Sequence, residues 1–262
     1  MSGSRTPSTT ASGTDPGGQT IQRYRYQICY TAFRALDLTE AFPEINAIYC
    51  EHYDDLIAEN SDGKFLSVQI KTRGYTQDLV RATDSDMVQT IATFTRLDKL
   101  FPGQFERFEI VTNHQFNEKS KSASNFPYLI QQVKNIDPSK PISKNSTVEK
   151  HFETIRKKYN IQQHDYISVM QRVHLRPFEH SIELLESFLF DRISEIIGSQ
   201  NTVSTVEKCA GTLMELVTNK SSSGQKPIHI KAQKFGIDFE DALEQADIES
   251  KRITFADLAP II

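Results

Sequence analysis

Apolar residues recur near the start of the chain at spacings of three and four, the period of an amphipathic helix. These residues are Ile21, Tyr24, Ile28, Ala32 and Ala35. A largely helical period returns over residues 78–100. The pattern therefore predicts a first helix that ends before Pro43 and a second, longer helix further along.

Three short apolar runs between these helices predict strands. Residues 45–50 (INAIYC) are apolar on both faces, as in a buried strand, and strand-like runs follow at 55–59 and 65–72. The last two runs flank a segment that contains Asp62-Gly63. This pair is a strong hairpin signal, because a type I′ turn needs positive φ at both central residues.

A fourth strand is predicted at residues 105–112, and the pattern is mostly helical from there on. It predicts helices at 124–134, 146–159, 179–197, 203–219 and 238–250, with a strand at 166–174. The order of helix, three strands, helix and strand is typical of a mixed α/β sheet flanked by helices. We therefore expect an α/β core at residues 20–117 and a mainly helical extension at 118–262. Residues 1–19 are almost wholly Ser, Thr, Gly, Pro and Asp, a composition typical of a disordered tail.

Charge and composition limit the classes of function. The net charge of −4 excludes an overall basic nucleic-acid coat, so a polyanion site has to be local. Residues 117–158 are locally basic, with nine Lys or Arg against four Asp or Glu. Three widely spaced cysteines do not form a disulfide framework, and with no apolar run of membrane-spanning length we expect a cytoplasmic protein. The apolar end ITFADLAPII leads us to expect that the chain is part of a longer protein.

The predicted hairpin brings polar groups together. If Asp62 and Gly63 form a two-residue loop, Asp55 lies opposite Ile70 and has Gln69 and Lys71 as diagonal neighbours. Gln69 and Lys71 share one face of their strand, because side chains alternate with a period of two. A carboxylate, an amide oxygen and an ammonium group are then expected at one edge of the hairpin.

These three groups fit the hydrolysis of a phosphodiester bond. The Asp55 carboxylate and the Gln69 amide oxygen are hard ligands that suit Mg²⁺, with Mn²⁺ as a substitute. Lys71 is placed to orient or deprotonate the attacking water and to offset developing negative charge. Asp54 is an alternative to Asp55 as the ligand, although Asp55 directly precedes the apolar residues of its strand. His52 lies near this site in the sequence and is a candidate for substrate contact.

The order of acid, hairpin and (acid or Gln)-x-Lys is the signature of the PD-(D/E)xK restriction-endonuclease-like nucleases. The segments GGQTIQRYRYQ, CEHYDD, VQIKTR and VTNHQF together resemble the N-terminal double-stranded DNA endonuclease domain of the CBASS (CD-NTase-associated) antiphage effectors. The resemblance covers residues 17–117 by motif. It implies a restriction-endonuclease-like fold and an effector nuclease of an antiphage system.

The resemblance also implies roles for residues of this chain. Asp55, Gln69 and Lys71 match the catalytic set, Glu51 is a second acidic residue, and Gln27 is a candidate for the wall of the site. Gln69 departs from the broader superfamily, which has an acid there, and this favours catalysis with one metal ion. Effectors of this kind are controlled by a sensor domain, a partner protein or assembly into homo-oligomers, so we expect one of these controls here.

Cations near the motif are candidates for DNA contact. They are Arg73, Arg81, Lys119, Lys121, Lys157 and Lys158. Contacts to phosphates give affinity without sequence information, and no base-reading module is recognised, so we expect low sequence specificity. Two alternatives stay open. The basic segment 117–158 can be an ordinary solvated surface, and the whole chain can be a non-catalytic, nuclease-like adaptor that binds a partner ATPase or sensor.

Overall fold

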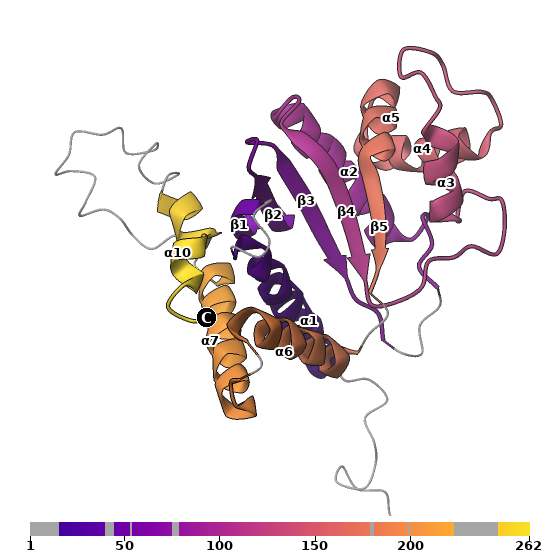
Figure 1. Cartoon of the computed structure of the whole chain (residues 1–262). Helices are drawn as coiled ribbons and strands as arrows, with labels where there is room; N and C mark the ends of the chain where they lie inside the picture. The colour runs from indigo at the N-terminus through magenta and orange to yellow at the C-terminus, as the bar shows by residue number, and fades with distance from the viewer. Residues whose placement is uncertain are drawn as a thin grey trace, which may run out of the picture.

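A six-stranded mixed sheet forms the centre of the molecule, with the strand order β5-β4-β3-β2-β1-β6 (Figure 1). The computed structural model describes residues 16–39, 45–52, 54–74, 79–178, 181–198, 200–222 and 246–262. The strands are β1 (Ile45–His52), β2 (Asp54–Asn60), β3 (Phe65–Lys71), β4 (Phe105–Thr112), β5 (Val173–Pro177) and β6 (Arg252–Ile253). Strands β3, β4 and β5 are parallel, whereas β1, β2, β3 and β6 pair antiparallel. This mixed sheet confirms the predicted α/β fold class.

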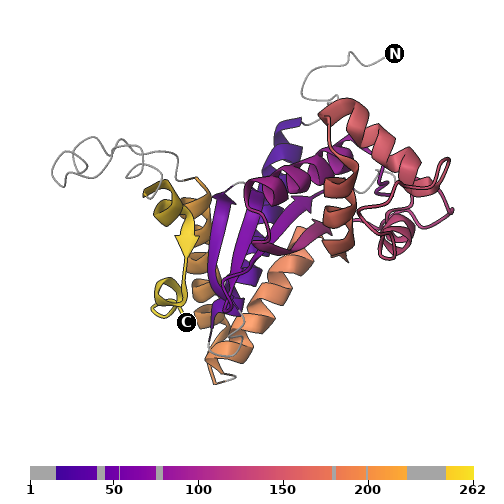
Figure 2. The same cartoon turned by 90° about the horizontal axis from the view of Figure 1, so that it is seen from above.

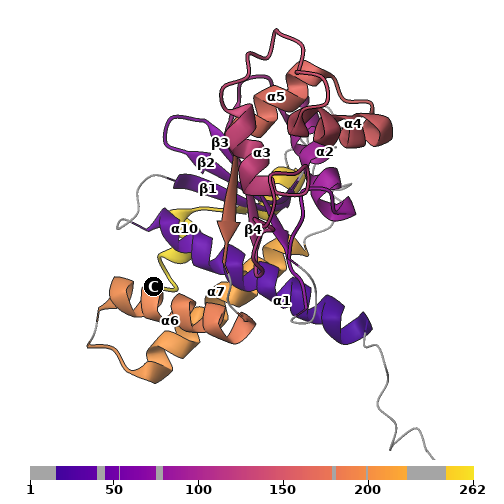
Figure 3. The ribbon, with the colours of Figure 1, turned by 90° about the vertical axis from the view of Figure 1, so that its right-hand side faces the viewer.

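Helices cover both faces of the sheet, and each face has its own apolar core. The first face carries α1 (Pro16–Ala35), the 3-10 helix η1 (Leu36–Leu38), α6 (Ile182–Ile197) and α7 (Val203–Ser221). The second carries α2 (Ser85–Leu100), α3 (Phe126–Val133), α4 (Thr147–Tyr159) and α5 (Gln163–Arg172). Figure 3 shows the strands between these two groups of helices. None of the described helices has the length and apolarity that a membrane crossing requires.

The predicted strand at 166–174 is wrong over most of its length, because residues up to Arg172 belong to α5 and β5 begins only at Val173. Tyr166, Ile167 and Met170 are all buried, at spacings of one, three and four that a helix places on one face. A short apolar run of this kind does not distinguish a buried strand from a buried helix.

Other element boundaries also move. Helix α1 begins at Pro16, within the predicted tail of residues 1–19, of which residues 1–15 lie outside the described part of the chain. The predicted helix at 238–250 lies outside it as well, up to residue 245. Two strands of the sheet, β5 and β6, come from the segment 118–262 that the pattern assigns to a helical extension.

The hairpin between β2 and β3 has a different turn from the predicted one. The loop contains three residues, because Asn60 N–H donates to the carbonyl of Lys64. Gly63 is at φ +75°, and Asp62 is not among the residues with positive φ, as a type I′ turn would need. Leu56 consequently pairs with Val68, and this register, continued by one residue, brings Asp55 level with Gln69 instead of Ile70.

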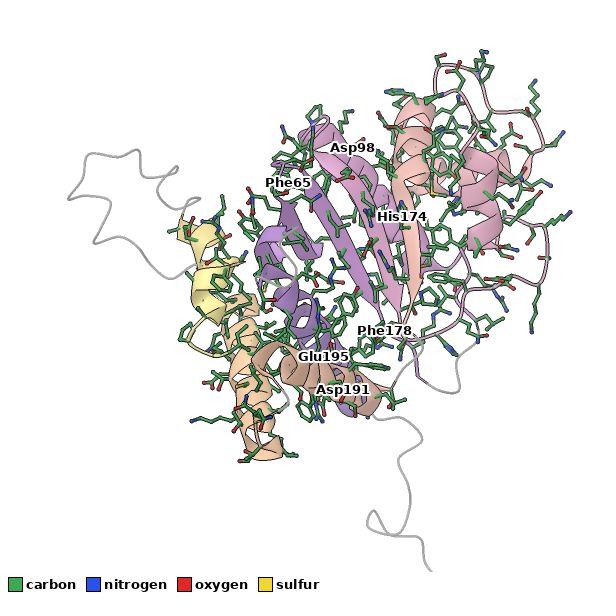
Figure 4. The ribbon with its side chains drawn as sticks, viewed as in Figure 1. Phe65, Asp98, His174, Phe178, Asp191 and Glu195 are labelled. Atoms are coloured by element: carbon green, nitrogen blue, oxygen red, sulfur yellow. The ribbon has the colours of Figure 1, made fainter. Side chains whose placement is uncertain are left out.

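This shift of one residue decides which side chains can meet. Directly opposed residues of an antiparallel pair share one face of the sheet. Opposite Ile70, Asp55 would point away from Gln69 and Lys71, whereas level with Gln69 it points toward them. Figure 4 labels Phe65 at the hairpin end of the strands and Phe178 at the other end, the end at which β3 stops.

Candidate active site

Three strand ends meet at this edge of the sheet, namely the end of β1, the start of β2 and the end of β3. Asp55, the second residue of β2, lies at their centre. Its Oδ2 atom accepts a hydrogen bond of 2.6 Å from the backbone N–H of Ile70. Burial raises the pKa of Asp55, and the Lys71 ammonium, the Ile70 N–H and the amides of Gln27 and Gln69 lower it. Four groups from two elements, β3 and α1, therefore surround this carboxylate.

Gln69 and Lys71 lie on β3, on either side of Ile70. Both are partly exposed. The Gln69 Oε1 atom lies 3.4 Å from the Thr90 hydroxyl of α2, which also donates to the carbonyl of Asp86. The structure thus brings together Asp55, Gln69 and Lys71, the three residues of the predicted set, and it adds Thr90 at their border.

Asp54 differs from Asp55 in its surroundings. It is 7% exposed, its Oδ2 atom accepts from the Ser67 hydroxyl, and its Oδ1 atom accepts from the backbone N–H of Asp55. Burial raises the pKa of Asp54 to about 8, the Ser67 hydrogen bond opposes this rise, and the Asp55 charge adds to it. Both oxygens of Asp54 are therefore hydrogen-bonded inside the protein, whereas Asp55 is partly exposed.

Glu51 lies at the end of β1 in an uncommon backbone conformation, with φ at +50°. A non-glycine residue in the left-handed region costs conformational energy, and such residues cluster at functional sites. Desolvation and the Asp55 charge raise the pKa of Glu51 to about 7, and Lys251 and Lys71 oppose this rise. The structure therefore places Glu51 in the same electrostatic cluster as Asp55 and Lys71.

Two members of this cluster carry no signal in the sequence. Lys251 directly precedes β6, which pairs with β1 through Ile48 and Tyr49 and so brings the end of the chain to Glu51. Figure 2 shows the yellow C-terminal strand beside the violet strands at one edge of the sheet. Tyr24 comes from α1, and desolvation together with the Glu51 charge raises its pKa. Gln27 lies one helical turn further along α1 and reaches Asp55.

The predicted DNA-binding cations fall into different settings. The Arg73 guanidinium forms an ion pair of 2.5 Å with Asp84, and the backbone of Arg73 is held by the side chain of Asn113. Arg73 therefore supports the segment that follows β3, and its guanidinium is engaged within the protein.

The other candidates are exposed. Arg81 and Lys119 lie on the wall of one surface cavity. Lys121 lies in the loop after β4, and Lys157 and Lys158 lie in the last turn of α4. The side chain of His52 lies outside the described part of the structure.

The oxygen donors of the site suit a hard divalent cation. Asp55 and Glu51 offer carboxylate oxygens and Gln69 an amide oxygen, the donor types that Mg²⁺ takes while it keeps several waters. Among the described residues, no group of three or more His, Cys, Asp or Glu is arranged as a metal centre. Asp55 and Gln69, together with several waters, could therefore hold such an ion, with Glu51 beside them as a second acid.

Comparison with known proteins gives one family. A family model described as "Cap4, dsDNA endonuclease domain" matches residues 15–221. Among solved structures, the Acinetobacter baumannii Cap4 SAVED/CARF-domain containing receptor with the cyclic trinucleotide 2'3'3'-cAAA is 15% identical with a TM-score of 0.47, over 81% of this chain and 42% of that chain. The Moraxella osloensis Cap4 SAVED/CARF-domain containing receptor is 13% identical with a TM-score of 0.44, over 78% of this chain and 44% of that chain. The chain thus spans less than half the length of these two proteins. No curated protein matches the sequence.

Proposed function

The chain belongs to the Cap4 double-stranded DNA endonuclease domain family, and from this we propose that it hydrolyses phosphodiester bonds of double-stranded DNA with low sequence specificity. The observation that carries this proposal is the convergence of Asp55, Gln69 and Lys71 at one sheet edge. A non-catalytic adaptor needs none of these three groups in contact. We assign the catalytic role to these residues, with Glu51 as a second acid.

We propose Mg²⁺ as the cofactor, with Asp55 and Gln69 as its protein ligands and Mn²⁺ as a substitute. When bound, the ion polarises a phosphoryl oxygen and supplies an activated water. Asp55 is the better ligand than Asp54, because both oxygens of Asp54 already accept hydrogen bonds, one from the Ser67 hydroxyl and one from the backbone N–H of Asp55. Asp55 accepts from the N–H of Ile70 and from the amides of Gln27 and Gln69, but all of these donors belong to the site itself.

Lys71 acts on the reacting phosphate. Its ammonium group lies close enough to Asp55 and Glu51 to oppose the rise in the pKa of both carboxyls that burial causes. In hydrolysis, negative charge grows on the phosphoryl oxygens as the water attacks, and a fixed ammonium favours that state over the ground state. Glu51, with a pKa near 7, is suited to accept or return a proton at neutral pH.

The biological setting is a further part of the proposal. We place the nuclease in the cytoplasm as the effector of a bacterial antiphage system, in which a sensor domain or partner protein and homo-oligomer assembly restrict cleavage of host DNA. The two related solved structures are SAVED/CARF-domain containing receptors, and one of them is in complex with a cyclic trinucleotide. A nucleotide sensor is accordingly the first class of control to test.

The test is cleavage of supercoiled plasmid by the purified chain in Mg²⁺, in Mn²⁺ and in EDTA. We expect nicked and linear products with either metal and none in EDTA. Folded Lys71→Ala is compared with the wild type, because this substitution removes a catalytic group and no metal ligand, and we expect it to abolish cleavage. Equal cleavage by wild type and Lys71→Ala would contradict the assigned site. Absence of cleavage by the wild type, alone and with candidate cyclic nucleotides or a sensor, would favour the adaptor function.

A further inference from the structure

A surface cavity of about 350 Å³ lies between the segment that precedes α2 and the loop that follows β4. Its lining consists of Leu79, Arg81, Thr83, Asn117, Lys119, Ser120 and Ser124. The first three come from the segment between β3 and α2, and the other four come from the loop after β4. Two cations, three hydroxyls and one amide face this space, and no carboxylate does among the described residues. This chemistry matches a phosphate group, which takes charge from Arg or Lys and hydrogen bonds from hydroxyls and amides.

The wall of the cavity is held by a chain of side-chain hydrogen bonds. Ser120, Ser122 and Ser124 are linked through their hydroxyls at 2.7 and 2.8 Å, and Asn117 donates to Ser124 at 3.1 Å. Asn125 closes the loop by donating to the carbonyl of Ser120. A loop ordered in this way loses little conformational freedom when an anion binds, which favours affinity.

Backbone pairing joins the two walls. Val80 and Phe116 form a parallel bridge, the N–H of Val80 donates to Gln115, and the N–H of Ala82 donates to Ser124. Arg81 and Lys119 are therefore fixed on facing walls by the fold, and their proximity does not depend on a contact between their own side chains.

Hydrogen bonds also connect the cavity to the candidate active site. Asp84 pairs with the Arg73 guanidinium and accepts from the backbone N–H of Arg81. Arg73 lies two residues beyond Lys71, and Asn113 holds its backbone beside the end of β4. Asp84 thus links the backbone of Arg81 to Arg73, which lies two residues beyond Lys71.

We propose that this cavity is a phosphate-binding subsite that grips the DNA backbone away from the scissile phosphate, with Arg81 and Lys119 as its cations. This inference rests on the proposed function, since it takes double-stranded DNA as the substrate. The subsite positions the duplex over Lys71 and Asp55 and reads no bases, because a phosphate is the same in every sequence.

The test measures DNA affinity against salt concentration. Each phosphate contact contributes a slope of roughly −0.9 to the plot of log K against log salt. We expect Arg81→Gln/Lys119→Gln to bind DNA more weakly on several unrelated duplexes and to reduce the slope by roughly one to two. The matched control is Arg96→Gln/Lys99→Gln, which removes the same two residue types from exposed positions in the distal half of α2. Fluorescence anisotropy in EDTA gives the affinities without cleavage, and circular dichroism checks folding.

A second pair of variants tests the cavity without removing a cation. Ser120 is exposed on the cavity wall, and Ser120→Asp would place a negative charge there, whereas Ser120→Asn is a neutral change of similar size. We expect weaker DNA binding for Ser120→Asp alone. Suppose that the wild type binds DNA, and that Arg81→Gln/Lys119→Gln and Ser120→Asp both keep its affinity and salt slope. The cavity is then not a DNA-binding subsite, and the proposed function still stands. If the wild type neither binds nor cleaves DNA, both fall together. Inorganic phosphate that binds the cavity in a ³¹P NMR titration, with the DNA slope of the cavity variants unchanged, would assign the cavity to free phosphate and overturn its role in DNA binding.

Discussion

The Asp55 carboxylate accepts a 2.6 Å hydrogen bond from the backbone N–H of Ile70, at the point where the pairing of β2 with β3 gives way to side-chain contacts. In a continuing ladder this N–H would donate to a carbonyl of the neighbouring strand. The side chain of Asp55 takes that place, so the carboxylate is fixed by the backbone of the residue between Gln69 and Lys71. The geometry of the candidate site is thus set by the sheet itself.

Two substitutions of Asp55 separate its charge from this hydrogen bond. Asp55→Asn keeps an oxygen that can accept from Ile70 N–H, so we expect normal folding, strongly reduced cleavage and weaker metal binding. Asp55→Ala removes the acceptor as well, and it should cost about 1–3 kcal/mol of unfolding free energy in addition. Excess Mg²⁺ should restore part of the cleavage activity of Asp55→Ala. Plasmid cleavage across a Mg²⁺ titration and urea unfolding measure the two effects, and a fully active Asp55→Asn would exclude Asp55 as a required ligand.

Lys71→Ala should abolish cleavage and leave folding and DNA binding nearly intact. Lys71 is partly exposed at the end of β3, so we expect its stability effect to stay within about 0.5 kcal/mol. The loss should fall on the transition state, at roughly 100-fold or more in rate. Unlike Asp55→Ala, this variant should not recover in excess Mg²⁺. Rescue by metal would show that Lys71 acts through the ion and not on the phosphate.

The amino-acid pattern predicts the centre of this site better than its border. The alternation of FLSVQIKT places β3 correctly, and the acid before the apolar run of β2 identifies Asp55. The turn could not be inferred, because Asp62-Gly63 fits both a two-residue loop and a three-residue loop with Gly63 at positive φ. Lys251 and Thr90 could not be inferred either, since only the pairing of β6 with β1 and the packing of α2 bring them to the site.

A buried carboxylate links the sheet to α1, and its removal should destabilise the fold. Glu109 of β4 is fully buried, and it is within 3.4 Å of the guanidinium groups of Arg34, Arg107 and Arg176. Glu109→Ala would leave the largely buried Arg34 without this partner, and we expect a loss of about 3–5 kcal/mol. Glu106→Ala, an exposed position on the same strand, is the matched control and should change stability little. Similar unfolding midpoints for the two variants would exclude a structural role for the Glu109 cluster.

His151 should make the stability of the protein depend on pH in the acid range. This residue is fully buried, its Nε2–H donates to the carbonyl of Ala82, and its Nδ1 faces the Tyr166 hydroxyl. Burial lowers the pKa of His151 to about 4, from an ordinary value of 6.5. Between these two values the unfolded chain binds more protons than the folded chain, so stability rises with pH there. The stability that neutral, buried His151 contributes is fully present above pH 6.5. As the pH falls toward 4, the free energy of unfolding should drop by about 3 kcal/mol for this reason.

His151→Gln tests this assignment, because Gln can still donate to the carbonyl of Ala82 and does not titrate. We expect the unfolding free energy of His151→Gln, measured in urea from pH 7 to pH 4, to fall by less than that of the wild type. His164 is on the surface, so His164→Gln should keep the wild-type dependence. An equal fall in the unfolding free energy of His151→Gln and the wild type would exclude His151 as the group that titrates.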